Sequence, residues 1–126
     1  MLLTLRNDLP FTTVTVTYAG VIKQIAEVLV DTGSATTVLS ADIAAELGIV
    51  PAPSDRIRML RGVGGHEIVF HRRVDRFRVG DRELEQFAIE IAGMDYGFDI
   101  NGIVGMNFLR QAGAVLNLGD LTLDYA

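Results

Sequence analysis

Residues 28–35 read Val-Leu-Val-Asp-Thr-Gly-Ser-Ala, and this stretch decides the fold. The run over residues 25–30 is short, apolar and rich in β-branched residues, which is typical of a buried strand. The strand ends in Asp31, so the sequence predicts a carboxylate delivered into the fold and followed by a sharp turn. A buried carboxylate is costly unless hydrogen-bond donors meet it.

The three residues after Asp31 are the donors that we expect. They are the hydroxyls of Thr32 and Ser34 and the backbone amide of Gly33, where the absence of a side chain permits a close approach. Because a donor to the charged form favours ionisation, Ser34 predicts a more acidic pH optimum than an alanine would give.

Length and composition indicate one domain over residues 1–126, mostly β and rich in turns. The chain is 49% hydrophobic and has 13 glycines and no cysteine, so it has no disulfide framework that would mark it as extracellular. Its N-terminus becomes charged too early for a signal peptide, and no apolar run could span a bilayer. We expect a cytoplasmic protein or a soluble domain of a larger one, without a membrane segment.

Charge and ligand spacing argue against nucleic acid and metal. The net charge is −5, which disfavours sequence-independent nucleic-acid binding. Arg76 and Arg78 alternate with Phe77 and Val79, which predicts a solvated strand face and not a basic patch. The acidic segment 95–101 lacks the ligands of a calcium loop, and the two histidines lack helical metal-binding spacing.

Hydrophobic patterning and turn residues predict the order of elements. The segment 62–65 has three glycines and predicts a hairpin lid; a phosphate loop is the rival reading, but no Lys-Ser or Lys-Thr and no helix follow it. Strands are expected at 12–18, 21–30, 36–39, 56–60, 68–79, 84–91, 100–104, 114–118 and 121–125, and helices at 41–47, capped by Ser40, and at 108–112, capped by Asn107.

Together these motifs resemble the retropepsin-like aspartic peptidases over roughly residues 12–125. The matching pieces are residues 28–34, the helix after Ser40, the glycine-rich 62–65 and residues 103–109. Residues 61–64 and 105–109 look especially like the protease-like domain of DNA-damage-inducible, ubiquitin-shuttle proteins and their bacterial relatives.

The resemblance implies a closed, mostly β retropepsin-like barrel with one or two short helices and a glycine-rich flap hairpin. It implies that Asp31 is the catalytic carboxylate, that Thr32 bonds its counterpart across a dimer axis, and that Gly33 lies against the substrate. It implies no cofactor. The expected substrate-binding residues are Leu29, Ser34, Val38, Gly64, Gly65 and Ile103.

One departure concerns the dimer. Retroviral members pair an Arg and an Asp at the positions of Met106 and Ala35, so this chain must stabilise a dimer differently. We expect the closing hairpin to do so, through the face shared by Leu121, Leu123 and Tyr125.

The chain carries only one Asp-Thr-Gly string, whereas aspartic-peptidase chemistry needs two carboxylates that share a proton. A single copy therefore predicts a twofold-symmetric homodimer with its axis between the two Asp31 side chains. The leading hypothesis is an aspartic endopeptidase that cleaves peptide or protein substrates beside apolar residues. The alternative is a catalytically silent peptide-binding or dimerisation module of the same fold.

Overall fold

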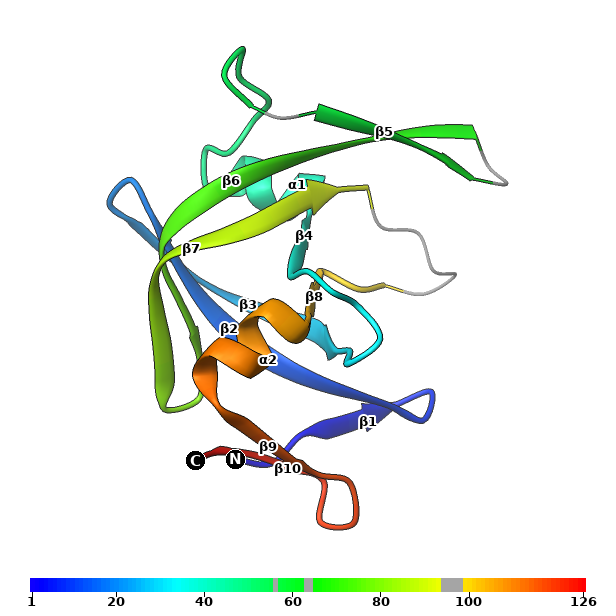
Figure 1. Ribbon diagram of the computed structural model, residues 1–126, viewed down its shortest axis with the longest axis vertical. Coiled ribbons are helices and arrows are strands. Elements are labelled where there is room, and N and C mark those ends of the chain that lie inside the picture. Colours follow the sequence, from blue (N-terminus) through cyan, green and yellow to red (C-terminus); the bar gives the residue numbers. More distant parts are fainter. Residues whose placement is uncertain (56, 63–64, 94–98) are drawn as a thin grey trace.

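Figure 1 shows the computed structural model, which describes residues 1–55, 57–62, 65–93 and 99–126, without the side chains of 58–62 and 65–68. The elements, in chain order, are β1 (Thr4–Arg6), β2 (Leu9–Tyr18), β3 (Val21–Val30), β4 (Val38–Ser40), α1 (Ala41–Glu46), β5 (Ile57–Gly62), β6 (Gly65–Val79), β7 (Arg82–Ala92), β8 (Gly102–Val104), α2 (Met106–Ala112), β9 (Ala114–Asn117) and β10 (Thr122–Tyr125).

The strands form a closed barrel, as the resemblance to retropepsin-like peptidases implies. The described strands of the main sheet run in the order β1-β2-β3-β8-β4-β7-β6-β5, and an additional pairing of β2 with β6 closes the sheet on itself. The barrel therefore consists of the six strands from β2 to β6 in that order, and β1 and β5 continue the sheet outside it. With α1 and α2 as its short helices, the predicted mostly β class is confirmed.

Alternating apolar residues place the core inside this barrel. On β2 the buried Val14 and Val16 alternate with threonines that are exposed or only partly buried. Three aromatic rings, those of Phe77, Phe87 and Phe108, pack together in the core with centroids 5.3 to 5.8 Å apart. The arginines at 76 and 78 are exposed while their neighbours at 77 and 79 are buried, so the predicted solvated face is confirmed.

The two helices begin differently from one another. The hydroxyl of Ser40 accepts a hydrogen bond from the Ile43 amide (3.3 Å), which confirms the predicted N-cap of α1. The prediction that Asn107 caps α2 is wrong, because the helix begins at Met106 and its N-cap is Gly105. The backbone amides of Met106 and Asn107 donate to loop carbonyls, so the first turn forms without a side-chain cap.

The closing hairpin, β9 and β10, packs against this chain's own core. Leu123 is 1% exposed, and Leu121 and Tyr125 contact the same core cluster. The phenol of Tyr125 donates to the Val79 carbonyl (2.6 Å), and burial raises its pKa to about 12. The prediction that this face meets a second subunit is therefore wrong, since the barrel already covers it.

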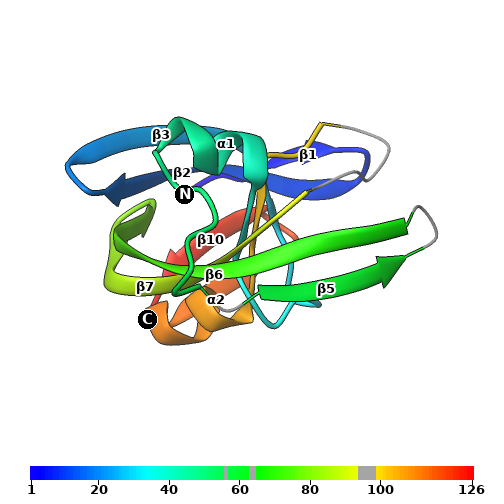
Figure 2. The same cartoon turned by 90° about the horizontal axis from the view of Figure 1, so that it is seen from above.

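The N-terminal segment completes this small sheet. Leu3 donates from its backbone to Leu121, and Leu123 donates to Met1, so residues 1–3 lie alongside β10. The terminal ammonium bonds the Leu123 carbonyl (2.9 Å) and the Asp124 carboxylate (2.8 Å). The two termini lie at the same end of the molecule in Figure 1, and Figure 2 shows that they are separated along the direction of view of Figure 1. Neither α1 nor α2, nor any other helix in the described part of the chain, is long and apolar enough to cross a membrane.

The predicted flap segment is flanked by strands. β5 pairs antiparallel with β6, and the last described pair joins Gly62 to Gly65. Gly64, which the sequence analysis places at the flap tip, lies outside the described residues. The expected acidic segment 95–101 is described only from residue 99 onward.

Candidate active site

Two strands far apart in the sequence bring the candidate site together. β3 and β8 pair in parallel, with Leu29 opposite Ile103 and Val30 opposite Val104. At the end of β3 the Asp31 amide donates to the Val104 carbonyl (3.0 Å), which extends the ladder by one bond. The paired segments, residues 28–30 and 102–104, are apolar and buried throughout, as expected of parallel pairing inside a barrel. The carboxylate therefore emerges where these two strands end.

Asp31 is only partly buried, and its donors differ from those expected. The Gly33 amide donates to Asp31 Oδ1 (2.8 Å), as predicted. The hydroxyl of Ser34 donates instead to the Thr36 carbonyl (2.7 Å), so the prediction that it bonds the carboxylate is wrong. The more acidic pH optimum expected from Ser34 loses its physical basis. Thr32 is exposed at the outside of the loop.

The predicted pocket residues meet on one side of the sheet. Leu29, Val38 and Ile103 lie in one small apolar cluster with Phe11 and Ile100, separate from the main core. The register explains why, because Phe11 lies opposite Leu29, which lies opposite Ile103, which lies opposite Val38. Four neighbouring strands thus present a continuous apolar floor beside the Asp31 loop. Of the other predicted substrate-binding residues, Ser34 lies in that loop and Gly65 begins β6.

A second loop, the turn at Gly105 between β8 and α2, crosses the Asp31 loop and packs directly against it. Met106 and Asn107 donate their amides to the carbonyls of Ser34 (2.8 Å) and Ala35 (3.1 Å). A Cβ atom added to Gly105 would lie 2.0 Å from the Thr36 carbonyl oxygen, closer than any non-bonded contact allows. Only glycine therefore lets the two loops stack at this distance.

Sequence reasoning missed the polar link inside this crossing. Thr37 is fully buried, and its hydroxyl donates to Asn107 Oδ1 (2.7 Å) and accepts from the Gly105 amide (3.1 Å). Asn107 in turn donates from its amide nitrogen to the Ala88 carbonyl (3.2 Å) on β7. A threonine next to an apolar strand carries no signal of such a link, and Asn107 was misread as a helix cap.

Two hollows flank α2 beside the Asp31 loop. One, of about 320 Å³, lies between Thr32, the helix residues Met106 and Leu109, and Leu116 of β9. The other, of about 500 Å³, shares Met106 with the first and reaches Ala35. Met106 and Ala35 thus line one surface next to the candidate active site.

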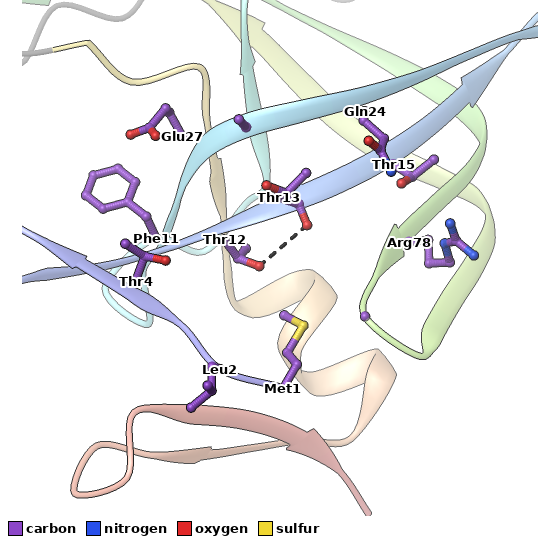
Figure 3. A pocket seen from close by; sticks show the side chains of 12 residues that line it. Met1, Leu2, Thr4, Phe11, Thr12, Thr13, Thr15, Gln24, Glu27 and Arg78 are labelled. Carbon is purple, nitrogen blue, oxygen red and sulfur yellow. Dashed lines mark hydrogen bonds between the residues drawn. The ribbon is translucent and has the colours of Figure 1, made fainter.

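Other possible sites are separate from Asp31. The groove in Figure 3, of about 410 Å³, lies between the N-terminal segment and the outer face of the β2–β3 hairpin. Its lining is largely polar, with side chains such as those of Thr15, Gln24 and Arg78, and contains no residue of the predicted site. Among the described residues, no three His, Asp or Glu side chains lie close enough to hold a metal ion.

Thr37→Val should destabilise the fold, because an isosteric methyl group leaves the Gly105 amide without its acceptor in the interior and removes one of the two donors to Asn107 Oδ1, which keeps the Phe108 amide. We expect the free energy of unfolding, measured with urea, to fall by about 1–3 kcal/mol. The exposed Thr13 provides the control, and Thr13→Val should change it by less than about 0.5 kcal/mol. Equal effects of the two substitutions would contradict the buried link.

Gly105→Ala should disrupt the crossing of the loops, since its Cβ would clash with backbone atoms that cannot move aside. The expected loss is about 3 kcal/mol or more in the same measurement. Gly119→Ala is the matched control, because the nearest atom to a Cβ there is 3.4 Å away. A stable Gly105→Ala protein with wild-type unfolding would show that the loops are less tightly packed than described.

Comparison with known proteins agrees with this geometry. A crystal structure of a retropepsin-like aspartic protease from Rickettsia conorii superimposes with a TM-score of 0.70, covering 98% of this chain and 95% of that one at 18% identity. The fold is therefore retropepsin-like. No curated protein matches the sequence. The family model described as "Aspartyl protease" matches residues 14–108, which is most of the chain. The protein therefore belongs to the aspartyl protease family.

Proposed function

We propose that the protein is a homodimeric aspartic endopeptidase in which each subunit supplies one Asp31 carboxylate. The observation that carries the proposal is the position of Asp31, partly exposed at the end of β3 and beside the apolar floor of Leu29, Val38 and Ile103. A lone carboxylate there cannot act as both acid and base. A twofold axis beside the loop would bring a second one within reach.

The proposed reaction divides two roles between the paired carboxylates. Two carboxylates about 3 Å apart cannot both ionise, so the pair carries one proton. The ionised Asp31 takes a proton from a water molecule while the water oxygen attacks the scissile carbonyl carbon. The protonated Asp31 of the other subunit donates its proton to the carbonyl oxygen. As the tetrahedral intermediate collapses, the carboxyl group that took the water proton gives it to the amide nitrogen, and the other carboxylate takes back the proton from the former carbonyl oxygen. The C–N bond breaks, and an acid and an amine are released. The amide of Gly33 fixes the orientation of each carboxylate through its bond to Oδ1.

The substrate would be an extended peptide with apolar side chains near the scissile bond. Leu29, Val38 and Ile103 provide a floor without charge, which suits aliphatic or aromatic side chains. Two glycines without side chains, Gly33 in the Asp31 loop and Gly65 in the β5–β6 hairpin, would let the peptide backbone lie close to the protein backbone on both sides. In this proposal Thr32 faces its counterpart across the axis, and Ser34 shapes the loop by holding the Thr36 carbonyl.

The surface around α2 is our candidate for the subunit contact. The hollows between Thr32, Ala35 and Met106 adjoin the Asp31 loop, so a second copy seated there would also bring its own carboxylate close. Ala114 and Leu116 of the closing hairpin line the first of these hollows and supply apolar side chains for such a contact. Apolar packing would then replace the ion pair of the retroviral relatives, which is energetically reasonable when both charges are absent.

Asp31→Asn should abolish cleavage of an unfolded protein substrate, because an amide can neither accept the proton from water nor donate as an acid. We expect kcat/KM to fall by roughly 10³-fold or more, measured by mass spectrometry of the products across acid to neutral pH. Asp8→Asn is the control, since Asp8 is an exposed turn residue with positive φ that asparagine adopts readily.

Two results would contradict the proposed activity. Cleavage that persists in the Asp31→Asn variant would exclude the mechanism. A wild-type protein that binds peptides but cleaves none at any pH would instead support the silent binding module.

Met106→Glu should weaken the dimer without unfolding the subunit. A carboxylate at the first position of α2 is compatible with the helix, but association of two subunits would bury its charge without a cation to pair with. Sedimentation velocity should show an association at least about tenfold weaker than that of the wild type. Ile22→Glu is the control, because Ile22 is 70% exposed at the opposite end of β3. Unchanged association in Met106→Glu would place the contact elsewhere.

A further inference from the structure

An ion pair with several hydrogen bonds lies away from Asp31, between Asp55 and Arg72. Arg72 Nη2 is 2.6 Å from Asp55 Oδ2, and Nε is 3.2 Å from Oδ1, so the guanidinium grips both carboxylate oxygens. The side chains of Asp55 and Arg72 are 7% and 17% exposed, respectively. A two-point contact of this kind fixes direction as well as distance.

Further hydrogen bonds tie this pair to β2 and to the loop between α1 and β5. Arg72 Nη1 donates to the Tyr18 hydroxyl (2.8 Å) at the end of β2, and Nη2 donates to the Val50 carbonyl (2.9 Å) after α1. Asp55 Oδ2 also accepts from the Ala52 amide (2.6 Å). Every nitrogen of the guanidinium therefore has a partner, and the loop before β5 is fastened to the barrel wall.

The position of the pair in the sheet gives it a mechanical role. β5 is an edge strand that pairs only with β6 among the described strands, and its first pair joins Ile57 to Phe70. Asp55 lies two residues before that pair, and Arg72 lies two residues beyond it on β6. From Phe70 onward β6 also pairs with β7 and so belongs to the barrel. The ion pair thus lies where the hairpin leaves the barrel, and Figure 1 shows the hairpin extending beyond the barrel above β4 and β8.

We propose that Asp55 and Arg72 are positioning residues that clamp the root of the β5–β6 hairpin and so set how closely it covers the apolar floor beside Asp31. With the clamp closed, both strands leave the barrel in a fixed direction. With the clamp broken, β5 keeps only its ladder with β6 and separates from it more often. The consequence for peptide binding rests on the proposed function, whereas the clamp itself does not.

The clamp remains charged in mild acid. The side-chain hydrogen bond from Arg72 lowers the pKa of Asp55 below its ordinary value of 3.8, and the Asp55 bond raises the pKa of Arg72. The groups facing Asp55 are Arg72 from β6 and the Ala52 amide from its own loop, and Tyr18 of β2 reaches the pair through Arg72. Because the folded pKa is depressed, the stabilisation is complete above the unfolded pKa and is lost as pH falls through the lower folded value.

Hydrogen exchange followed by mass spectrometry tests the clamp directly. In Asp55→Asn and in Arg72→Met, the amides of β5 should exchange at least about tenfold faster than in wild type, while those of β2 and β3 keep their rates. Arg73→Met is the matched control, because Arg73 is an exposed neighbour whose bond is to the Gln86 carbonyl. In the double variant the β5 exchange rate should rise by less than the two single effects combined, since neither charge is then left unpaired.

The outcomes separate the clamp from a general loss of stability. Unchanged β5 exchange, or equal acceleration in β2 and β3, would overturn the proposal. The difference between wild type and Asp55→Asn should persist in mild acid and disappear only below pH 3.8. In cleavage assays both variants should raise KM more than they lower kcat. A wild-type protein that cleaves no peptide would refute the proposed function. The exchange data would still show whether Asp55 and Arg72 hold the root of the hairpin.

Discussion

The close crossing of two loops, at Thr36 and Gly105, is the constraint on which the rest of the structure depends. The parallel pairing of β3 and β8 brings the loops together, and backbone bonds from Met106 and Asn107 hold one beneath the other. Because these contacts are mostly between backbone atoms, they fix the position of the carboxylate loop with little dependence on neighbouring side chains. The requirement on sequence is concentrated in one glycine and one buried threonine.

The same pairing builds the site around the loop. Since β2, β3, β8 and β4 are neighbours in that order, side chains of four strands meet on one face and form the apolar floor. The carboxylate at the end of β3 lies beside that floor but at the surface of the subunit. In the proposed dimer, this carboxylate and the two hollows along α2 next to it would form half of an active site, and a second copy would supply the other half. Catalysis and association would then depend on the same few residues.

Local patterns in the sequence account for much of this. Alternation predicts the β2–β3 hairpin and the exposed Arg76 and Arg78, and Ser40 marks the start of α1. The three floor residues follow from the resemblance to retropepsin-like peptidases. Long-range contacts are what the sequence does not reveal. The Ser34 hydroxyl bonds the Thr36 carbonyl in a loop whose backbone is held by Met106 and Asn107, which are far away in the sequence. The outer and inner faces of β9 and β10 are both partly apolar, and only the packed barrel shows which one is covered. Asp55 and Arg72 are separated by a whole hairpin, so nothing local pairs them.

The central claim is that the active centre is shared between two subunits, and a subunit-mixing titration tests it most directly. Wild-type protein is mixed with increasing amounts of inactive Asp31→Asn protein, allowed to exchange subunits, and assayed at constant total concentration. If each centre needs two carboxylates, activity falls as the square of the wild-type fraction, to about one quarter in an equal mixture. A decline in simple proportion to the wild-type fraction would show that one subunit acts alone and would contradict the account.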